Sequence, residues 1–184
     1  MQLEIYIVGG GTAGSVLARR LSEDGRISVL LLEAGPDHYA FPLSHIPAMA
    51  LYMQDSHVDW QYSTVPQQKA CLGLKNKVSR WRAGKMLGGS SVLNGVMAVR
   101  GHPHDFHVWA EKHDNEQWRY EDVLPYFKRV ESYADRSFEG RGTSGPISIQ
   151  ETDHNKVGEI LLEAFEEMGH KATKDYNAIQ QAVA

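Results

Sequence analysis

The sequence predicts an α/β protein that opens with a parallel β-α-β unit, and three observations near its start carry that prediction. The β-branched and aromatic run 4–8 (EIYIV) stops at a glycine and fits a buried parallel strand. Residues 12–23 place apolar side chains on one helical face, and Asp24-Gly25 ends that helix with turn chemistry. Residues 28–32 (SVLLL) predict a second buried strand, so the unit fills about 30 residues, the size of one crossover.

The rest of the chain predicts additional mixed elements. Residues 36–83 are rich in Pro, His and Tyr and predict a long irregular segment, of the kind that covers a site or carries function. Hydrophobic spacing predicts a helix over 120–130, in which Pro125 is tolerated only near the start. Further helices are predicted over 105–113 and 155–168, and a short strand over 147–149.

Composition excludes several classes of protein. Hydrophobic residues make up 42% and charged residues 23% of the chain, values typical of a globular domain. The net charge of −4 comes without the clustered basic face that binds nucleic acid, so we expect no nucleic-acid partner. No run approaches the ~18 apolar residues of a membrane span, and we identify no signal peptide before the first strand. The single cysteine, Cys71, excludes an intrachain disulfide.

The pattern Gly9-x-Gly11-x-x-Gly14 lies between the first strand and the helix, the context in which it indicates dinucleotide binding. Gly9 allows a tight turn, and Gly11 lets the backbone approach a pyrophosphate at the helix N-terminus. Gly14 lets helix and strand pack closely. Glu33 ends the second strand, where its carboxylate would accept hydrogen bonds from a ribose diol and repel the 2′-phosphate of NADP. The fingerprint fits FAD and NAD equally.

A second glycine block, residues 84–107, reads GKMLGGSSVLNGVMAVRGHPHDFH. Its backbone N–H groups and the hydroxyls of Ser90 and Ser91 suit a phosphate or the edge of a flavin. Capping of a helix N-terminus by either serine is an alternative that can hold at the same time.

Two polar clusters predict no site. The spacing of His102, His104 and His107 fits no standard ligand pattern, so we expect no metal. The alternating Asp55, His57 and Asp59 are assigned to the solvated edge of a loop.

Taken together, the segments around these motifs resemble the glucose-methanol-choline (GMC) family of FAD-dependent oxidoreductases. The resemblance rests on IYIVGGGTAGSVLARRLSEDGRISVLLLEAG, on VDWQYSTVPQ and on GKMLGGSSVLNGVMAVRGHPHDFHVWA, with GTSGPISI and DYNAIQQAV similar to later family segments. It runs through the whole chain but covers about the first third of a typical member. His107, where members often carry an acid, and Ala178, where they carry glycine, depart from the pattern.

The resemblance implies a Rossmann-like FAD-binding domain over 1–150 and the start of a substrate-side α+β domain over 151–184, both incomplete. Carried over by position, Glu33 would bind the ribose with Ala34 beside it, and Trp60 would lie against the cofactor. The pyrophosphate would be held by Gly9, Gly11, Thr12, Ala13 and Gly14. The flavin and pyrophosphate would be lined by Met86, Ser90, Asn94, Gly95, Val96 and Met97.

The resemblance also implies the chemistry. Some members attach flavin covalently through a histidine one residue before the asparagine, where this chain has Leu93, so non-covalent FAD is implied. Members oxidise a CH–OH group of a small-molecule alcohol by hydride transfer to flavin N5, and either oxygen or another acceptor reoxidises the flavin. The catalytic histidine of the family lies near the C-terminus, and no segment here matches that region, so we predict no catalytic residue in this chain.

Two alternatives remain open. In the first, the chain is a truncated, non-catalytic flavin-fold fragment or a shortened paralogue, because no segment matches the catalytic histidine region of the family. An NAD-dependent dehydrogenase fits the first 35 residues but leaves residues 84–107 unexplained.

Overall fold

The computed structural model describes residues 3–135, 138–151 and 155–177. The chain divides into two compact units, Met1–Met97 and Ala98–Ala184. The domain boundary at residue 150 follows from the expected roles of the two parts and stays a prediction.

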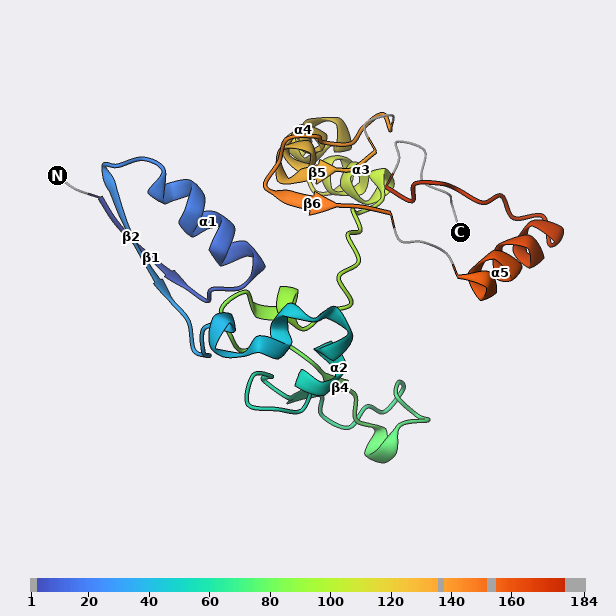
Figure 1. Ribbon diagram of the computed structural model, residues 1–184, viewed down its shortest axis with the longest axis horizontal. Coiled ribbons are helices and arrows are strands. Elements are labelled where there is room, and N and C mark those ends of the chain that lie inside the picture. The colour runs from blue at the N-terminus through green and yellow to red at the C-terminus, as the bar shows by residue number, and fades with distance from the viewer. Residues whose placement is uncertain (1–2, 136–137, 152–154, 178–184) are drawn as a thin grey trace. The chain divides into compact units, whose positions relative to one another are not determined.

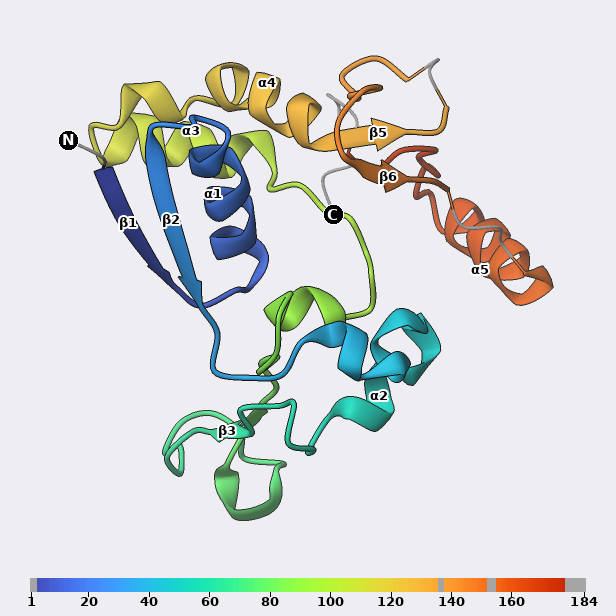
Figure 2. The same ribbon diagram turned by 60° about the vertical axis from the view of Figure 1, so that its left-hand side comes forward.

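The first unit opens with the predicted β-α-β arrangement. Strand β1 (Leu3–Val8), helix α1 (Thr12–Ser22) and strand β2 (Ile27–Leu32) follow one another in sequence. The strands pair in parallel, and their register runs from Leu3 opposite Ile27 to Val8 opposite Leu32. Figures 1 and 2 show α1 alongside both strands. The predicted order and pairing are therefore confirmed.

The prediction that both strands are buried is wrong. Alternate residues of β2 are exposed, and the side chains of Tyr6 and Val8 on β1 are 63% and 84% exposed. Ile7 contacts the α1 side, where its Cγ2 lies 3.3 Å from the position of a Cβ on Gly14. Because α1 packs on one face of this two-stranded sheet, the side chains on the other face stay open.

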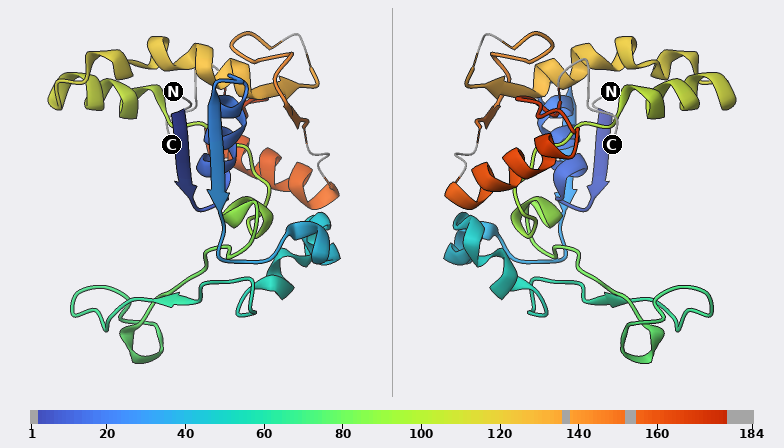
Figure 3. Two further views of the ribbon diagram at one scale, coloured as in Figure 1. Left: turned by 90° about the vertical axis from the view of Figure 1, so that its left-hand side faces the viewer. Right: turned by 90° about the vertical axis from the view of Figure 1, so that its right-hand side faces the viewer.

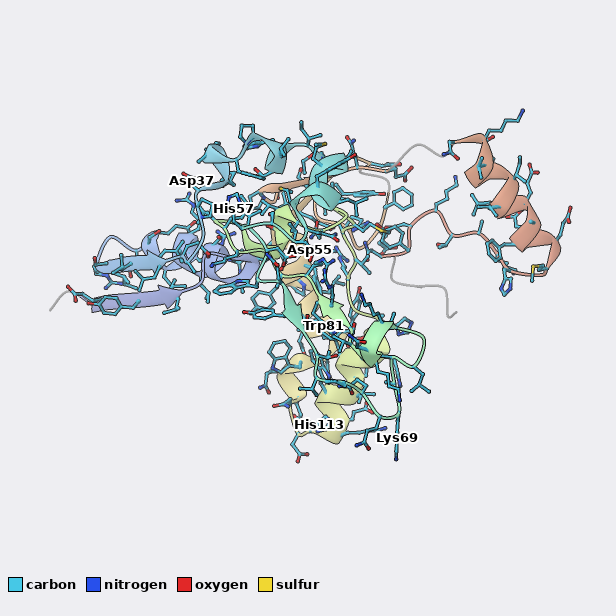
Figure 4. The ribbon with its side chains drawn as sticks, turned by 90° about the horizontal axis from the view of Figure 1, so that it is seen from below. Asp37, Asp55, His57, Lys69, Trp81 and His113 are labelled. Atoms are coloured by element: carbon cyan, nitrogen blue, oxygen red, sulfur yellow. The ribbon has the colours of Figure 1, made fainter. Side chains whose placement is uncertain are left out.

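The remainder of the first unit is a long irregular segment, as predicted, with short regular pieces inside it. These are helix α2 (Ala50–Met53) and an antiparallel pair of strands, β3 (Tyr62–Ser63) and β4 (Arg80–Trp81). Figure 3 shows the loop that joins β3 to β4, and Figure 4 marks Lys69 on that loop and Trp81 on β4. Single 3₁₀ turns occur at His38–Ala40, Pro42–His45, Pro47–Met49, Lys75–Lys77 and Gly89–Val92.

The apolar core of the first unit is small and lies in this segment. It consists of Ala50, Met53, Val58, Met86 and Leu93, with Phe41, Leu43 and Val92 packed against it. Val58 and Met86 are completely buried. The core therefore joins the irregular segment to the second glycine block, and it fixes the position of that block within the unit.

The second unit contains helices α3 (Pro103–Lys112), α4 (Tyr120–Val130) and α5 (Lys156–Glu167), and a 3₁₀ turn at Glu116–Trp118. Strands β5 (Glu131–Tyr133) and β6 (Ile147–Ile149) pair in parallel. The predicted helices and the strand at 147–149 are confirmed. The prediction that Pro125 lies near the start of its helix is wrong. Pro125 occupies the sixth of the eleven positions of α4. Strand β5 was not predicted.

A buried network of charged side chains forms the interior of the second unit. Glu131 on β5 accepts from Arg100 Nη2 at 2.6 Å and from Arg141 Nη1 at 2.9 Å. Arg141 also pairs with Asp175 through Nε at 2.9 Å and Nη2 at 3.0 Å. The guanidinium of Arg141 lies 4.2 Å from the ring centre of Tyr133. Burial opposes the charge of Arg141, but its hydrogen bonds to Asp175 and the nearby Glu131 carboxylate outweigh this and raise its pKa.

Within the described ranges, no helix is both long enough and apolar enough to cross a membrane.

Candidate cofactor-binding site

The turn between β1 and α1 has the tight geometry that its glycines predict. Gly9 has a φ of +98°, a left-handed conformation that favours glycine, and its N–H donates to the Leu32 carbonyl at 2.7 Å. A Cβ on Gly14 would lie 1.9 Å from the Gly9 carbonyl oxygen. The predicted close packing at Gly14 is therefore confirmed, because no side chain fits between α1 and the turn.

The N-terminus of α1 presents N–H groups without a protein cap. The N-cap residue is Gly11, which makes no side-chain hydrogen bond, and the first turn holds no acidic residue. The free N–H groups and the positive end of the helix dipole therefore favour an anion here. A Cβ on Gly11 would meet only the Gly89 Cα, at 3.8 Å, so the space in front of this turn is open.

Glu33, directly after β2, holds the glycine turn in place. Its Oε2 accepts from the Gly10 N–H at 2.7 Å, and its Oε1 accepts from the Gly35 N–H at 3.0 Å. Each carboxylate oxygen has two lone-pair sites, so both oxygens can still accept from a diol. The sequence predicted a ligand contact for Glu33 but not this structural role.

The two glycine blocks meet backbone to backbone, although they lie far apart in the sequence. The Gly88 N–H donates to the Gly10 carbonyl at 2.7 Å, and a Cβ on Gly89 would lie 2.7 Å from the Gly11 Cα. Gly89 also has a positive φ, of 56°. Glycine at this position therefore satisfies both a close approach and a left-handed backbone.

The alternative that a serine caps a helix here is wrong. The 3₁₀ turn at Gly89–Val92 begins from Gly88, without a side-chain cap. Ser90 Oγ accepts from the Gly84 N–H at 3.2 Å, and Ser91 Oγ donates to the Gly88 carbonyl at 2.7 Å. Both hydroxyls therefore stabilise the block itself.

Trp60 is held at the edge of the same region. Its N–H donates to the Ala83 carbonyl at 2.8 Å, and its ring stacks on Tyr62 with ring centres 5.8 Å apart and planes 4° apart. The Lys85 ammonium lies 4.8 Å from the centre of the Trp60 ring. These contacts present an aromatic surface beside a positive charge.

These elements line an open cavity of about 830 Å³ in the first unit. It is lined by nine of the predicted cofactor-binding residues: Gly9, Gly11, Thr12, Ala13, Gly14, Glu33, Ala34, Trp60 and Ser90. The sequence did not predict the other lining residues, which are Ile7, Val8, Leu17, Leu32, Gly84 and Gly89. The cavity combines an anion-favouring helix end with an apolar wall, and its volume suits an organic cofactor.

The other five predicted residues lie elsewhere in the first unit. Met86 is fully buried in the apolar core. Asn94, Gly95, Val96 and Met97 do not line the cavity but form an exposed turn, in which Asn94 Oδ1 accepts from the Val96 N–H at 2.8 Å. The cofactor contacts of all fourteen residues stay predictions.

Asp59 is the residue that sequence reasoning placed wrongly. Its side chain is fully buried and not at a solvated loop edge. It accepts from the N–H groups of Asp55 at 3.0 Å, Gln61 at 2.9 Å and Ala83 at 3.1 Å. Burial opposes the charge of Asp59, but these donors and the nearby Arg82 outweigh it and lower the pKa of this carboxyl. Asp59 thereby ties the strand pair β3–β4 to the segment that carries Trp60, a long-range role that leaves no periodic signal in a sequence.

Asp55, by contrast, is exposed and pairs with Arg80 at 3.0 Å and Arg82 at 2.6 Å; Figure 4 marks its position.

The remaining clusters give no competing site. Among the described residues, no group of three histidine, cysteine or acidic side chains is placed to hold a metal ion. His102 Nδ1 accepts from the His104 N–H at 3.1 Å and caps α3, while His107 pairs with Glu121 at 3.1 Å. A shallower recess of about 510 Å³ in the second unit contains none of the predicted site residues.

Comparisons with known proteins agree with this geometry. An oxygen-dependent choline dehydrogenase of Brucella anthropi is 43% identical over 187 residues, which cover 98% of this chain and 32% of the relative. The corresponding protein of Rhizobium etli is 40% identical over the same shares of both chains. The chain thus spans about a third of the length of these curated relatives.

Solved structures of the same kind share the fold. Pyridoxine 4-oxidase from Mesorbium loti matches with a TM-score of 0.86 and 32% identity, over 97% of this chain and 35% of that one. A formate oxidase matches with a TM-score of 0.82 and 30% identity, over 97% of this chain and 33% of the oxidase. The GMC oxidoreductase family model matches residues 3–182, nearly the whole sequence, and the chain therefore belongs to the GMC oxidoreductase family.

Proposed function

We propose that the first unit binds FAD non-covalently in its cavity, as the cofactor-binding part of an enzyme that oxidises the CH–OH group of a small-molecule alcohol. GMC oxidoreductases bind FAD, and a solved relative is an FAD-dependent oxidoreductase from Chaetomium thermophilum. The observation that carries the proposal is the open space in front of the uncapped α1 N-terminus, which a Cβ on Gly11 would enter.

The residues present fit a dinucleotide in their chemistry. The N–H groups of Thr12, Ala13 and Gly14 at the start of α1 would neutralise a pyrophosphate. Glu33 would accept from a ribose diol while it keeps its bonds to Gly10 and Gly35. The apolar wall of Ile7, Val8 and Leu32 suits the adenosine portion.

Bound FAD would supply the redox chemistry by accepting a hydride from the alcohol. The chain itself would bind and orient the cofactor. Trp60, with its stacked Tyr62 partner, would exclude water from one side, and Lys85 would place a positive charge beside that aromatic pair. We assign no catalytic base among residues 1–184. Leu93, at the position of the covalent histidine of some members, is buried in the core and offers no nitrogen to a flavin, which supports non-covalent binding.

The substitution Gly11→Ala tests the proposal. The φ of Gly11, −76°, is compatible with alanine, and the added methyl group has room in the protein. The unfolding free energy of the variant should therefore stay within about 0.5 kcal/mol of the wild-type value. The methyl would occupy the phosphate space, and FAD affinity should fall roughly tenfold or more. Flavin absorbance of the protein purified at its natural length, and titration of the apoprotein with FAD, measure both quantities.

Gly25→Ala is the matched control, because a Cβ there meets nothing within 4 Å and lies on a turn outside the cavity. A wild-type protein without flavin, or a Gly11→Ala protein with unchanged FAD affinity, would refute the proposed site.

A flavin fold that binds FAD without turnover is the alternative to this proposal, and the same protein tests it. It predicts that the protein binds FAD but that no alcohol in a panel of choline, pyridoxine and simple primary alcohols bleaches the flavin absorbance under anaerobic conditions. Bleaching by any one of these alcohols excludes it.

A further inference from the structure

The turn Asn94–Met97 is strained and must be held by other groups. Val96 has a φ of +60°, a left-handed conformation that is costly for a β-branched residue. Such conformations persist where surrounding contacts determine them. On the N-terminal side, the Asn94 side chain supplies one contact by accepting from the Val96 N–H at 2.8 Å.

The second contact comes just after the turn, at Ala98 and Arg100. The side chain of Asn177 donates from Nδ2 to the Ala98 carbonyl at 2.6 Å and accepts at Oδ1 from the Arg100 N–H at 2.7 Å. One amide therefore satisfies the donor and the acceptor of a backbone segment that begins directly after Met97. Asn177 is only 1% exposed, so these bonds are shielded from water.

Asn177 is itself fixed by the charged network of the second unit. Its N–H donates to Asp175 Oδ1 at 2.9 Å, and Asp175 pairs with Arg141. The segment 98–100, which Asn177 binds, is also held by other contacts. The Arg100 side chain pairs with Glu131 and donates to the Gly140 carbonyl at 3.0 Å. The amide thus connects two segments of one buried network, at Asp175 and at Arg100.

We propose that Asn177 is a positioning residue for the turn Asn94–Met97: it holds the chain at Ala98 and Arg100 so that Val96 keeps its strained conformation before the cofactor binds. The inference rests on the proposed function and adds to it that this turn, which does not itself line the cavity, contacts the bound FAD. Asn177 itself touches neither the turn nor the cofactor cavity, and it acts through the backbone.

The test compares Asn177→Ala with Asp175→Asn in the protein purified at its natural length. Asp175→Asn removes the charge that pairs with Arg141 but keeps a side-chain oxygen that can accept from the Asn177 N–H, and it leaves the Asn177 side chain on Ala98 and Arg100, so it controls for a general loss of stability. Asn115→Ala, at a position whose side chain caps no helix, controls for loss of an asparagine from the second unit.

Two readouts are measured on each variant: hydrogen exchange of the Val96 amide in the apoprotein, and FAD affinity by titration. The Val96 amide keeps its Asn94 partner in every variant, so faster exchange there reports a loosened turn and not the deleted bonds. We expect Asn177→Ala to speed this exchange about tenfold and to weaken FAD binding about tenfold, and Asp175→Asn to change neither by more than about twofold.

Equal effects of Asn177→Ala and Asp175→Asn on both readouts would overturn the proposal and leave Asn177 a purely structural residue. If the alanine variant does not fold, Asn177→Asp replaces it, because it keeps the volume and the acceptor for the Arg100 N–H, while it loses the donor to Ala98 and adds a negative charge. A wild-type protein that binds no FAD would refute the proposed function, while the exchange of Val96 would still decide whether Asn177 holds the turn.

Discussion

At Gly14 the backbone of α1 passes closest to the turn that precedes it, and the contact leaves no room for a methyl group. We expect Gly14→Ala to lower the unfolding free energy by roughly 2 kcal/mol or more, because the clash exceeds the gain of about 1 kcal/mol in helix propensity. Urea denaturation against the Gly25→Ala control measures the loss. Stability equal to the control would show that the turn can move away from α1.

We expect Asp59 to make the first unit sensitive to acid. Its pKa is lowered in the folded state, so the stability it adds is complete above the unfolded value of about 3.9 and is lost as pH falls through the folded value. Asp59→Asn should cost about 2 kcal/mol near neutral pH, and this difference from the wild type should shrink below about pH 4.

Chemical denaturation between pH 3 and pH 7 follows the effect of Asp59. Glu163→Gln on the exposed surface of α5 serves as the control and should leave the pH profile unchanged. A difference between wild type and Asp59→Asn that stays constant over this range would contradict the role of the charged carboxylate.

Among the elements, those with a strong local pattern were predictable from sequence. Helices α1, α4 and α5 follow hydrophobic spacing, and β1 and β2 are apolar runs that end in glycine turns. Strand β5 was missed because its residues, Glu131-Ser132-Tyr133, owe their burial to distant arginines and not to a local alternation. The burial of β1 and β2 was overestimated for a similar reason, since burial depends on which layers pack on the sheet.

The element β5 depends on its charged residue. Replacing Glu131 by Gln leaves Arg100 without its buried carboxylate and weakens the pairing of Arg141, so we expect a loss of roughly 3–5 kcal/mol. The matched control is Glu111→Gln, whose partner Arg119 lies 3.7 Å away at the surface, and which should cost at most about 1 kcal/mol. Thermal and urea unfolding compare the two variants. Equal losses would show that the buried network adds little to the stability of the unit.

For the whole molecule, large apolar side chains remain uncovered in both units. The open sheet face carries Tyr6, Val8, Leu30 and Leu32, and α5 carries Val157, Ile160, Leu161, Phe165 and Met168, all exposed. We expect a polypeptide limited to residues 1–184 to bind a hydrophobic dye, to self-associate and to unfold over a broad range of temperature. Calorimetry and light scattering without added FAD test this. A cooperative, monomeric transition would contradict it.

The candidate site was predictable where its residues belong to one short motif and unpredictable where the fold brings segments together. Nine of the fourteen predicted residues line the cavity because they stand on or directly beside the strand ends and glycine turns. Met86 could not be assigned to the core from sequence, since its neighbours Met53 and Val58 come from a segment without periodicity.

The contact between the two glycine blocks has a consequence for how this sequence can diverge. The Gly10 carbonyl accepts a hydrogen bond from the Gly88 N–H, and the backbone at Gly11 occupies the space that a side chain on Gly89 would need. A substitution in either block therefore changes what the other can accept, and the positions should vary together over evolution. Grafting the N-terminal glycine turn onto another scaffold without residues 84–90 would remove the backbone that packs against Gly10 and Gly11.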